Sequence, residues 1–157
     1  MTRLRGRAER GQRVHGAAPH EHWNSTTVIG AIRLDGSTAC MAIEAATDTE
    51  VFNAYVSKVL CPLLRPGDLV VMDNLAPHKS EPALALIRQT GADVLFLPAY
   101  SPDLNPIEQM WSKVKNTLRS LEARTQDALH QAISQALAQI TPQDIRNWFA
   151  HCGYNFI

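Results

Sequence analysis

The sequence predicts one mixed α/β domain in a chain of 157 residues. Two β-rich stretches flank the turn signal Asp35-Gly36, which indicates an antiparallel hairpin. Further along, the apolar runs 69–72 and 93–97 are separated by a stretch with helical periodicity, which indicates a strand–helix–strand unit with parallel strands. With 45% hydrophobic residues, the chain can build one core.

The first expected elements are strands over 26–34 and 38–44, joined by the Asp35-Gly36 turn. Asp48 is a good cap residue, and apolar residues recur after it at helical spacing. We therefore expect a helix from Asp48 up to Pro62, and we expect it to pack on the sheet.

The second half of the chain alternates strand and helix and then becomes helical. After the strand over 69–72, Ser80 begins a helix that Gly91 closes, and the strand over 93–97 follows. The remaining helices are expected from Pro106 to about Leu118, from about Thr125 to Ile140, and from Thr141 to near Cys152.

Residues 1–24 contain too little apolar sequence for a core element and are interpreted as a basic arm, with the domain over 25–157. The formal net charge of the chain is zero, so bulk charge indicates no partner. The arm is nevertheless locally positive, which suits a phosphate backbone. Its arginines are Arg3, Arg5, Arg7, Arg10 and Arg13. The alternative is a solvated terminus without a partner.

Cysteine usage and hydropathy exclude several classes of protein. Three widely spaced cysteines form neither a disulfide framework nor a zinc-binding pattern. The amino terminus has no apolar signal core, and no apolar run approaches the length of a membrane span. We expect a soluble, cytoplasmic protein without a membrane partner.

Two acidic residues stand where two of the expected elements meet a loop. Asp73 ends the apolar run 70–72, and Glu108 lies in the first turn of the helix that begins at Pro106. Carboxylates that converge from a strand end and a helix start suit magnesium or manganese, which take oxygen ligands in phosphate chemistry. Taken singly, each acid has a structural alternative, as a turn cap or as a charge that favours the helix dipole.

Glu108 ends the motif Ser101-Pro-Asp-Leu-Asn-Pro-Ile-Glu108, with Trp111 one turn later and Asp73 upstream. This arrangement resembles the region of the second and third acids in a DDE (Asp-Asp-Glu) transposase. The resemblance is to the mariner-like bacterial insertion-sequence group and covers nearly the whole chain. It implies a ribonuclease-H-like mixed sheet flanked by helices, with extra carboxy-terminal helices. The opening strand of that fold is missing here, which would leave two half-sheets.

The resemblance also implies magnesium-dependent cleavage and transfer of DNA strands. In the family, three carboxylates coordinate two metal ions; Asp73 matches the second acid and Glu108 the third. The first acid belongs to the opening strand, before the arginine-rich arm, and no residue of this sequence fills that position. We therefore expect a remainder of a catalytic domain that is inactive by itself.

Several neighbours of the two acids are supporting candidates. Asn74 and His78 would face the site and orient a metal-bound water or a phosphate, or they are turn and cap residues. Asn105 shapes the loop before Glu108 and can cap its helix. Asp103 is a weaker rival ligand because it lies in the proline-bound loop. Lys113 and Lys115 either line a DNA groove or belong to a solvated helix face.

The expected partners are DNA, as transposon ends and target, and a second copy or a full-length transposase. The alternative function is that of an inactive truncated transposase, which binds DNA or the full-length enzyme and inhibits it. The amino-acid sequence of residues 101–108 disfavours a plain ribonuclease-H-type nuclease.

Overall fold

The computed structural model of the protein describes residues 6–15 and 25–154. These residues form two compact units. The sheet unit contains the described residues of 24–109 and 141–157, and the helix unit contains those of 1–23 and 110–140. The expected mixture of helices and short strands is confirmed.

The hairpin consists of β1 (Thr27–Ile32) and β2 (Thr38–Ile43), which pair in antiparallel fashion. Arg33 N donates to Ser37 O at 2.9 Å and Gly36 N donates to Arg33 O at 2.9 Å. The loop therefore has three residues and ends on Gly36, whose φ of 96° lies in the left-handed region. The predicted hairpin is confirmed, with a turn one residue longer than a two-residue Asp-Gly turn.

Helix α1 (Thr49–Tyr55) begins where Asp48 predicts it, because the Asp48 carboxylate accepts a hydrogen bond from Val51 N at 2.8 Å. The helical path then continues as a π-helical turn, η1 (Val56–Leu60), and a 3₁₀ turn, η2 (Cys61–Leu63). It thus passes the predicted end at Pro62. A proline fits in the first residues of the 3₁₀ turn because an N–H there would have no intrahelical partner.

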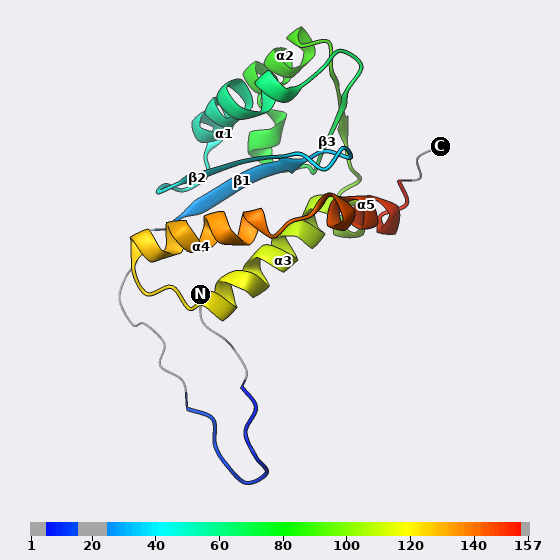
Figure 1. Cartoon of the computed structure of the whole chain (residues 1–157). Coiled ribbons are helices and arrows are strands. Elements are labelled where there is room, and N and C mark those ends of the chain that lie inside the picture. The colour runs from blue at the N-terminus through cyan, green and yellow to red at the C-terminus, as the bar shows by residue number, and fades with distance from the viewer. Residues whose placement is uncertain (1–5, 16–24, 155–157) are drawn as a thin grey trace. The chain divides into compact units, whose positions relative to one another are not determined.

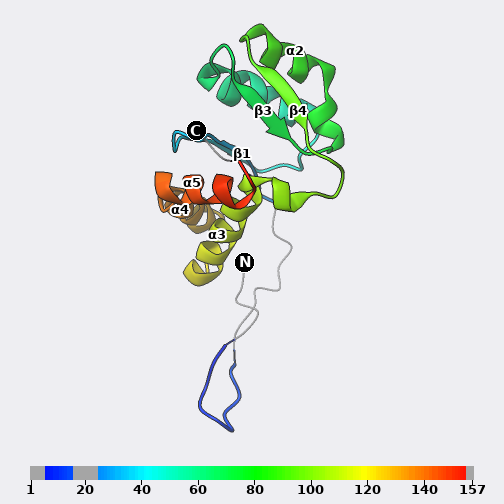
Figure 2. The ribbon, with the colours of Figure 1, turned by 90° about the vertical axis from the view of Figure 1, so that its right-hand side faces the viewer.

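The strand–helix–strand unit consists of β3 (Leu69–Met72), α2 (Glu81–Gln89) and β4 (Asp93–Phe96). The two strands are parallel, with Leu69 opposite Asp93 and Met72 opposite Phe96, and Figure 2 shows them side by side. The prediction is confirmed for this unit.

The hairpin and the parallel pair are two separate two-stranded sheets within the described residues. This division agrees with the expectation of two half-sheets. Residues of both sheets pack against the same core, and Figure 1 shows α1 and α2 on one side of the hairpin. The ribonuclease-H-like topology itself stays a prediction.

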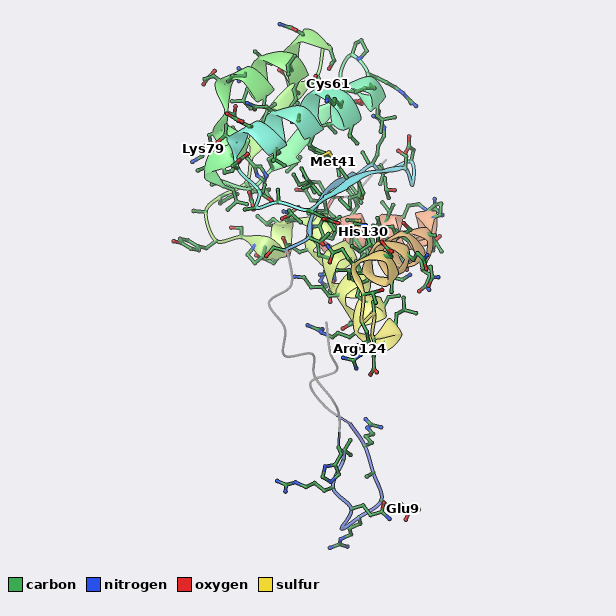
Figure 3. All side chains as sticks on the ribbon, turned by 90° about the vertical axis from the view of Figure 1, so that its left-hand side faces the viewer. Glu9, Met41, Cys61, Lys79, Arg124 and His130 are labelled. Atoms are coloured by element: carbon green, nitrogen blue, oxygen red, sulfur yellow. The ribbon has the colours of Figure 1, made fainter. Side chains whose placement is uncertain are left out.

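The core of the sheet unit lies between these strands and helices α1 and α2. Its buried residues are Phe52, Tyr55, Val56, Leu60, Met72, Ala83, Leu84, Ile87 and Ala92. From the hairpin, Ile29 and Met41 pack against it, and from the parallel pair Val70 and Phe96 do so. Figure 3 shows Met41 on the side of the hairpin that faces the helices. The alternation of each strand explains this, since residues two apart share a face.

An ion pair joins the end of β1 to the beginning of β3. The two terminal guanidinium nitrogens of Arg33 donate to the Asp68 carboxylate at 2.6 and 2.5 Å, and Arg65 N donates to the same carboxylate at 2.7 Å. The hydrogen bond from Arg33 is the main cause that lowers the pKa of Asp68. This bidentate contact holds the two sheets together at one end.

The last three helices follow the predicted order. Helix α3 (Pro106–Leu121) starts in the sheet unit and extends into the helix unit, where α4 (Gln126–Ala138) is capped by Thr125. Helix α5 (Pro142–His151) belongs to the sheet unit and begins with a reciprocal capping box between Thr141 and Asp144. None of the helices in the described residues combines the length and apolar character that a membrane crossing requires.

Gly36 meets two constraints, and a matched glycine separates them. A Cβ at Gly36 would lie 2.6 Å from Pro142 Cβ, whereas a Cβ at Gly67, with a similar φ of 85°, would meet nothing within 4 Å. We expect Gly67→Ala to lose about 1–2 kcal/mol from the left-handed backbone alone, and Gly36→Ala to lose more. Urea unfolding of both variants measures this difference; equal losses would show that Pro142 moves aside freely.

The Arg33–Asp68 pair should make stability depend on pH. The pKa of Asp68 is lower in the folded state than in the unfolded state. The Asp68 carboxylate therefore contributes its full share to the free energy of unfolding above the unfolded pKa of about 3.9. This contribution is lost as the pH falls through the folded pKa. We expect Asp68→Asn to cost about 1 kcal/mol or less at pH 7 for this partly exposed pair, and progressively less below pH 4. Urea unfolding at pH 7 and below pH 4 tests this. Arg33→Gln should likewise cost stability at pH 7 and less below pH 4.

Candidate functional site

Asp73 directly follows β3 and opens a short loop that contains the 3₁₀ turn η3 (Ala76–Lys79). One of its carboxylate oxygens, Oδ1, accepts a hydrogen bond from Leu75 N at 3.1 Å. The Asp73 side chain remains 41% exposed. The carboxylate is therefore fixed by its own loop and still reachable from solvent, as a ligand must be.

His78 lies close to this carboxylate, with Nδ1 2.6 Å from Asp73 Oδ1. The nitrogen nevertheless makes no well-directed hydrogen bond, so the contact is a close polar approach in which the ring nitrogen is not aimed at the oxygen. On its other side the imidazole lies against Phe52 of α1, with ring centroids 4.7 Å apart. Helix α1 thus backs the side chain that touches Asp73.

Two further hydrogen bonds hold the loop between β3 and α2. The Asn74 amide donates to the Leu97 carbonyl, just beyond β4. At the other end of the loop, Ser80 Oγ donates to Asn53 Oδ1 at 2.7 Å, which ties the start of α2 to α1. The Asn74 side chain therefore connects the ends of the two parallel strands by a hydrogen bond.

Glu108 lies in the first turn of α3 and is exposed. The helix start is set by the 3₁₀ turn η4 (Pro102–Leu104) and by Asn105, whose carbonyl accepts from Glu108 N at 3.1 Å. The predicted side-chain cap by Asn105 stays a prediction. An acidic residue in a first helical turn is electrostatically favoured, so this placement needs no ligand to be stable.

The Asp103 charge acts on the carboxy-terminal segment. Together with burial, the Asp103 charge raises the pKa of Cys152 at the end of α5. The same 3₁₀ turn accepts a hydrogen bond from Tyr154 Oη at the Leu104 carbonyl, at 2.9 Å. Asp103 thus lies on a turn that contacts the carboxy-terminal segment.

The structure brings Asp73, Asn74 and His78 together with Phe52 and Leu97, and it places Glu108 on the helix that follows β4 in the same unit. Carboxylates are the right kind of ligand for a hard cation such as magnesium. Within residues 6–15 and 25–154, no cluster of three or more histidine, cysteine or acidic side chains is arranged to hold a metal ion. A metal shared by Asp73 and Glu108 stays a prediction.

The described basic residues that are expected to contact DNA fall in the helix unit. Arg3 and Arg5 lie outside the described residues, whereas Arg7, Arg10 and Arg13 are exposed on a loop that also carries Glu9 (Figure 3). On α3, Lys115 is exposed.

Lys113, also on α3, donates from Nζ to the Gln139 carbonyl at 2.9 Å. Lysine at this place satisfies a carbonyl at the end of α4, which is a structural role in addition to any contact with DNA.

Sequence reasoning missed the residues that support the Asp73 loop from a distance. Phe52 fits the apolar spacing of the first expected helix, and Leu97 ends the expected strand over 93–97, so the sequence assigns neither of them to the site. Both are far from Asp73 in the sequence, so no local pattern indicates their contacts with His78 and Asn74.

Comparison with known proteins gives one family and two curated relatives. A family model described as a DDE superfamily endonuclease matches residues 1–130. The transposable element Tcb2 transposase of Caenorhabditis briggsae is 32% identical over 85 residues, which cover 52% of this chain and 31% of that protein. The human histone-lysine N-methyltransferase SETMAR is 28% identical over 85 residues, 54% of this chain and 12% of that protein. The chain thus spans less than a third of either relative.

The hydrogen bond between Asn74 and Leu97 can be tested by measuring the free energy of unfolding. Asn74→Ala removes the donor and leaves the Leu97 carbonyl without it, so we expect a loss of about 0.5–1.5 kcal/mol in the free energy of unfolding. The exposed Asn116→Ala variant on α3 is the control and should change stability by less than about 0.5 kcal/mol. Similar urea midpoints for the two variants would contradict a supporting role of Asn74.

Proposed function

Because this chain belongs to the DDE superfamily of endonucleases, we propose that it serves metal-dependent cleavage and transfer of DNA strands in transposition. One observation carries the proposal: the match to the family extends over residues 1–130, which include Asp73 and Glu108 with their surrounding motifs. The likeness to a curated transposase supports a transposase-like function. The finer assignment, to a mariner-like bacterial insertion sequence, rests on the resemblance carried by residues 101–108.

Asp73 and Glu108 are proposed to hold magnesium or manganese, together with the first acid, which the resemblance assigns to a segment preceding the arginine-rich arm. When bound, such ions supply an activated water or 3′-hydroxyl and stabilise the leaving oxygen. The chain's own contribution is to fix the Asp73 loop and to place Glu108 in the first turn of α3. His78 limits the rotation of the Asp73 carboxylate by its contact at 2.6 Å, and Asn74 fixes the loop on β4.

The proposed partner is DNA, as transposon ends and as target. The exposed arginines Arg7, Arg10 and Arg13, with Arg3 and Arg5 in the same arm, would contact phosphates without reading bases. Lys115 is the exposed lysine of α3 that can add to this surface, while Lys113 also holds the end of α4.

The second candidate is an inactive transposase fragment that binds DNA, another copy or the full-length transposase and inhibits it. Among residues 6–15 and 25–154 there are two two-stranded sheets, and this division favours the second candidate, because each sheet has strand edges to which another chain can add.

Cleavage of DNA in magnesium or manganese separates the two candidates. We expect residues 1–157 alone not to nick or join DNA, because two carboxylates do not complete the set of ligands. A longer protein, extended through the segment before the arm, should cleave. In it, His78→Ala should lower the rate about 10- to 100-fold, the range for groups that orient metal ligands, and Asp73→Ala or Glu108→Ala should lower it further.

Inhibition is measured by adding residues 1–157 to the longer protein. A fall in its rate that persists at saturating DNA supports mixed oligomers, and a fall that excess DNA removes supports competition for DNA. Metal-dependent cleavage by residues 1–157 alone, lost in Asp73→Ala, would contradict the assignment of the first acid to a separate segment.

The arginine arm predicts how DNA binding responds to salt. Arg7, Arg10 and Arg13 changed together to glutamine should weaken binding uniformly across DNA sequences and reduce the slope of log K against log salt by about 3, since each phosphate contact contributes about 0.9. Fluorescence anisotropy over a salt series measures this slope. An unchanged slope would show that the arm does not contact DNA.

A further inference from the structure

Tyr100 is the most unusual residue on the segment that leads to Glu108. Its φ is 58°, and among the described residues only Glu122 shares a left-handed backbone without being glycine. The Tyr100 side chain is also fully exposed, at 102%. A large aromatic residue is strained in this conformation, because its Cβ approaches the following carbonyl oxygen.

Neither the backbone nor packing accounts for a tyrosine at this position. Glycine would adopt the conformation without strain, and a buried ring would gain hydrophobic stabilisation that the exposed Tyr100 ring lacks. Strained residues that the surroundings hold in place are concentrated at functional sites. The combination of strain and full exposure therefore indicates that the ring serves a partner.

The position of Tyr100 relates it to both candidate ligands. Leu97, just upstream, donates from its N–H to the Met72 carbonyl at 2.8 Å and accepts from Asn74, so the segment begins beside the Asp73 loop. Downstream, the Leu104 carbonyl is held by Tyr154 and the Asn105 carbonyl by Glu108 N. The ring is thus presented from a segment anchored on both sides.

We propose that Tyr100 is a base-stacking residue that receives an unpaired base of DNA next to Asp73 and Glu108. This inference rests on the proposed function. An aromatic face binds any base by stacking, so it can hold a strand without selecting a sequence. A neutral ring also suits a position near two carboxylates, where phosphates are repelled unless a cation is bound.

A stacking role requires a base, whereas phosphate contacts do not. The test compares residues 1–157 and its Tyr100 variants on a single-stranded oligonucleotide and on the same strand with abasic positions, by fluorescence anisotropy at fixed salt. For the parent chain we expect tighter binding of the intact strand. Tyr100→Ala should bind the intact strand about five-fold more weakly or worse, which is the lower end for one stacked base. Its affinity for the abasic strand should equal that of the parent chain. Tyr100→Phe should retain the preference.

Tyr100→Gly gives an independent readout. It should raise the midpoint of thermal unfolding by removing the strain, while it abolishes the preference for the intact strand. The matched control is Glu122→Gly at the other left-handed position, which should also raise the midpoint but leave the ratio of intact to abasic binding unchanged.

The outcomes separate this inference from the proposed function. Salt-dependent binding that is equal for intact and abasic strands in the parent chain overturns the stacking role and leaves the DNA-binding function standing. Binding of neither strand overturns both. A Tyr100→Ala variant that keeps the preference for bases but loses self-association assigns the ring to a protein contact and overturns the proposal.

Discussion

The parallel pairing of β3 with β4 is the constraint on which the candidate site depends. Because the carboxyl ends of parallel strands meet at one edge of a sheet, the residues that follow each strand start from the same place. Asp73 follows β3 directly, and the segment to Glu108 begins at Leu97, which is bonded to Met72 and Asn74. A shift of this register by one residue would turn Asp73 to the other face and break both bonds.

Helix α1 acts on the same site from the other side. Phe52 is almost fully buried in the core and still provides the surface on which His78 lies. The core and the site therefore share a side chain, so that changes in the packing of α1 reach Asp73 through one ring contact. Such coupling explains why the loop after β3 can be short and partly exposed yet still hold its carboxylate.

The sequence predicts the order and type of the elements because each has a local signal. Asp48 and Thr141 mark helix starts by capping, and Gly36 and Gly91 mark a turn and a helix end by their backbone freedom. The apolar runs 69–72 and 93–97 mark the parallel strands. The continuation of α1 as a π-helical turn was not predicted, since apolar spacing of three and four residues does not distinguish it from an ordinary helix.

The supporting contacts of the site could not be predicted for a different reason. Contacts such as Phe52 with His78, Asn74 with Leu97, and Lys113 with Gln139 join residues from separate elements. Their partners are set by how those elements pack, and a single sequence carries no record of that. The left-handed conformation of Tyr100 is equally hidden, because tyrosine gives none of the glycine or asparagine signals by which such positions are recognised.

The two-stranded sheets have a consequence for hydrogen exchange. Asp93 N bonds to Asp68 O and Leu97 N to Met72 O, so the register directs the amides of Val70 and Met72 toward β4 and those of Leu69 and Val71 away from it. Within the described residues the outward amides meet no third strand. Slow and fast exchange should therefore alternate along β3, and a polypeptide strand added at that edge would slow the fast amides and remove the alternation.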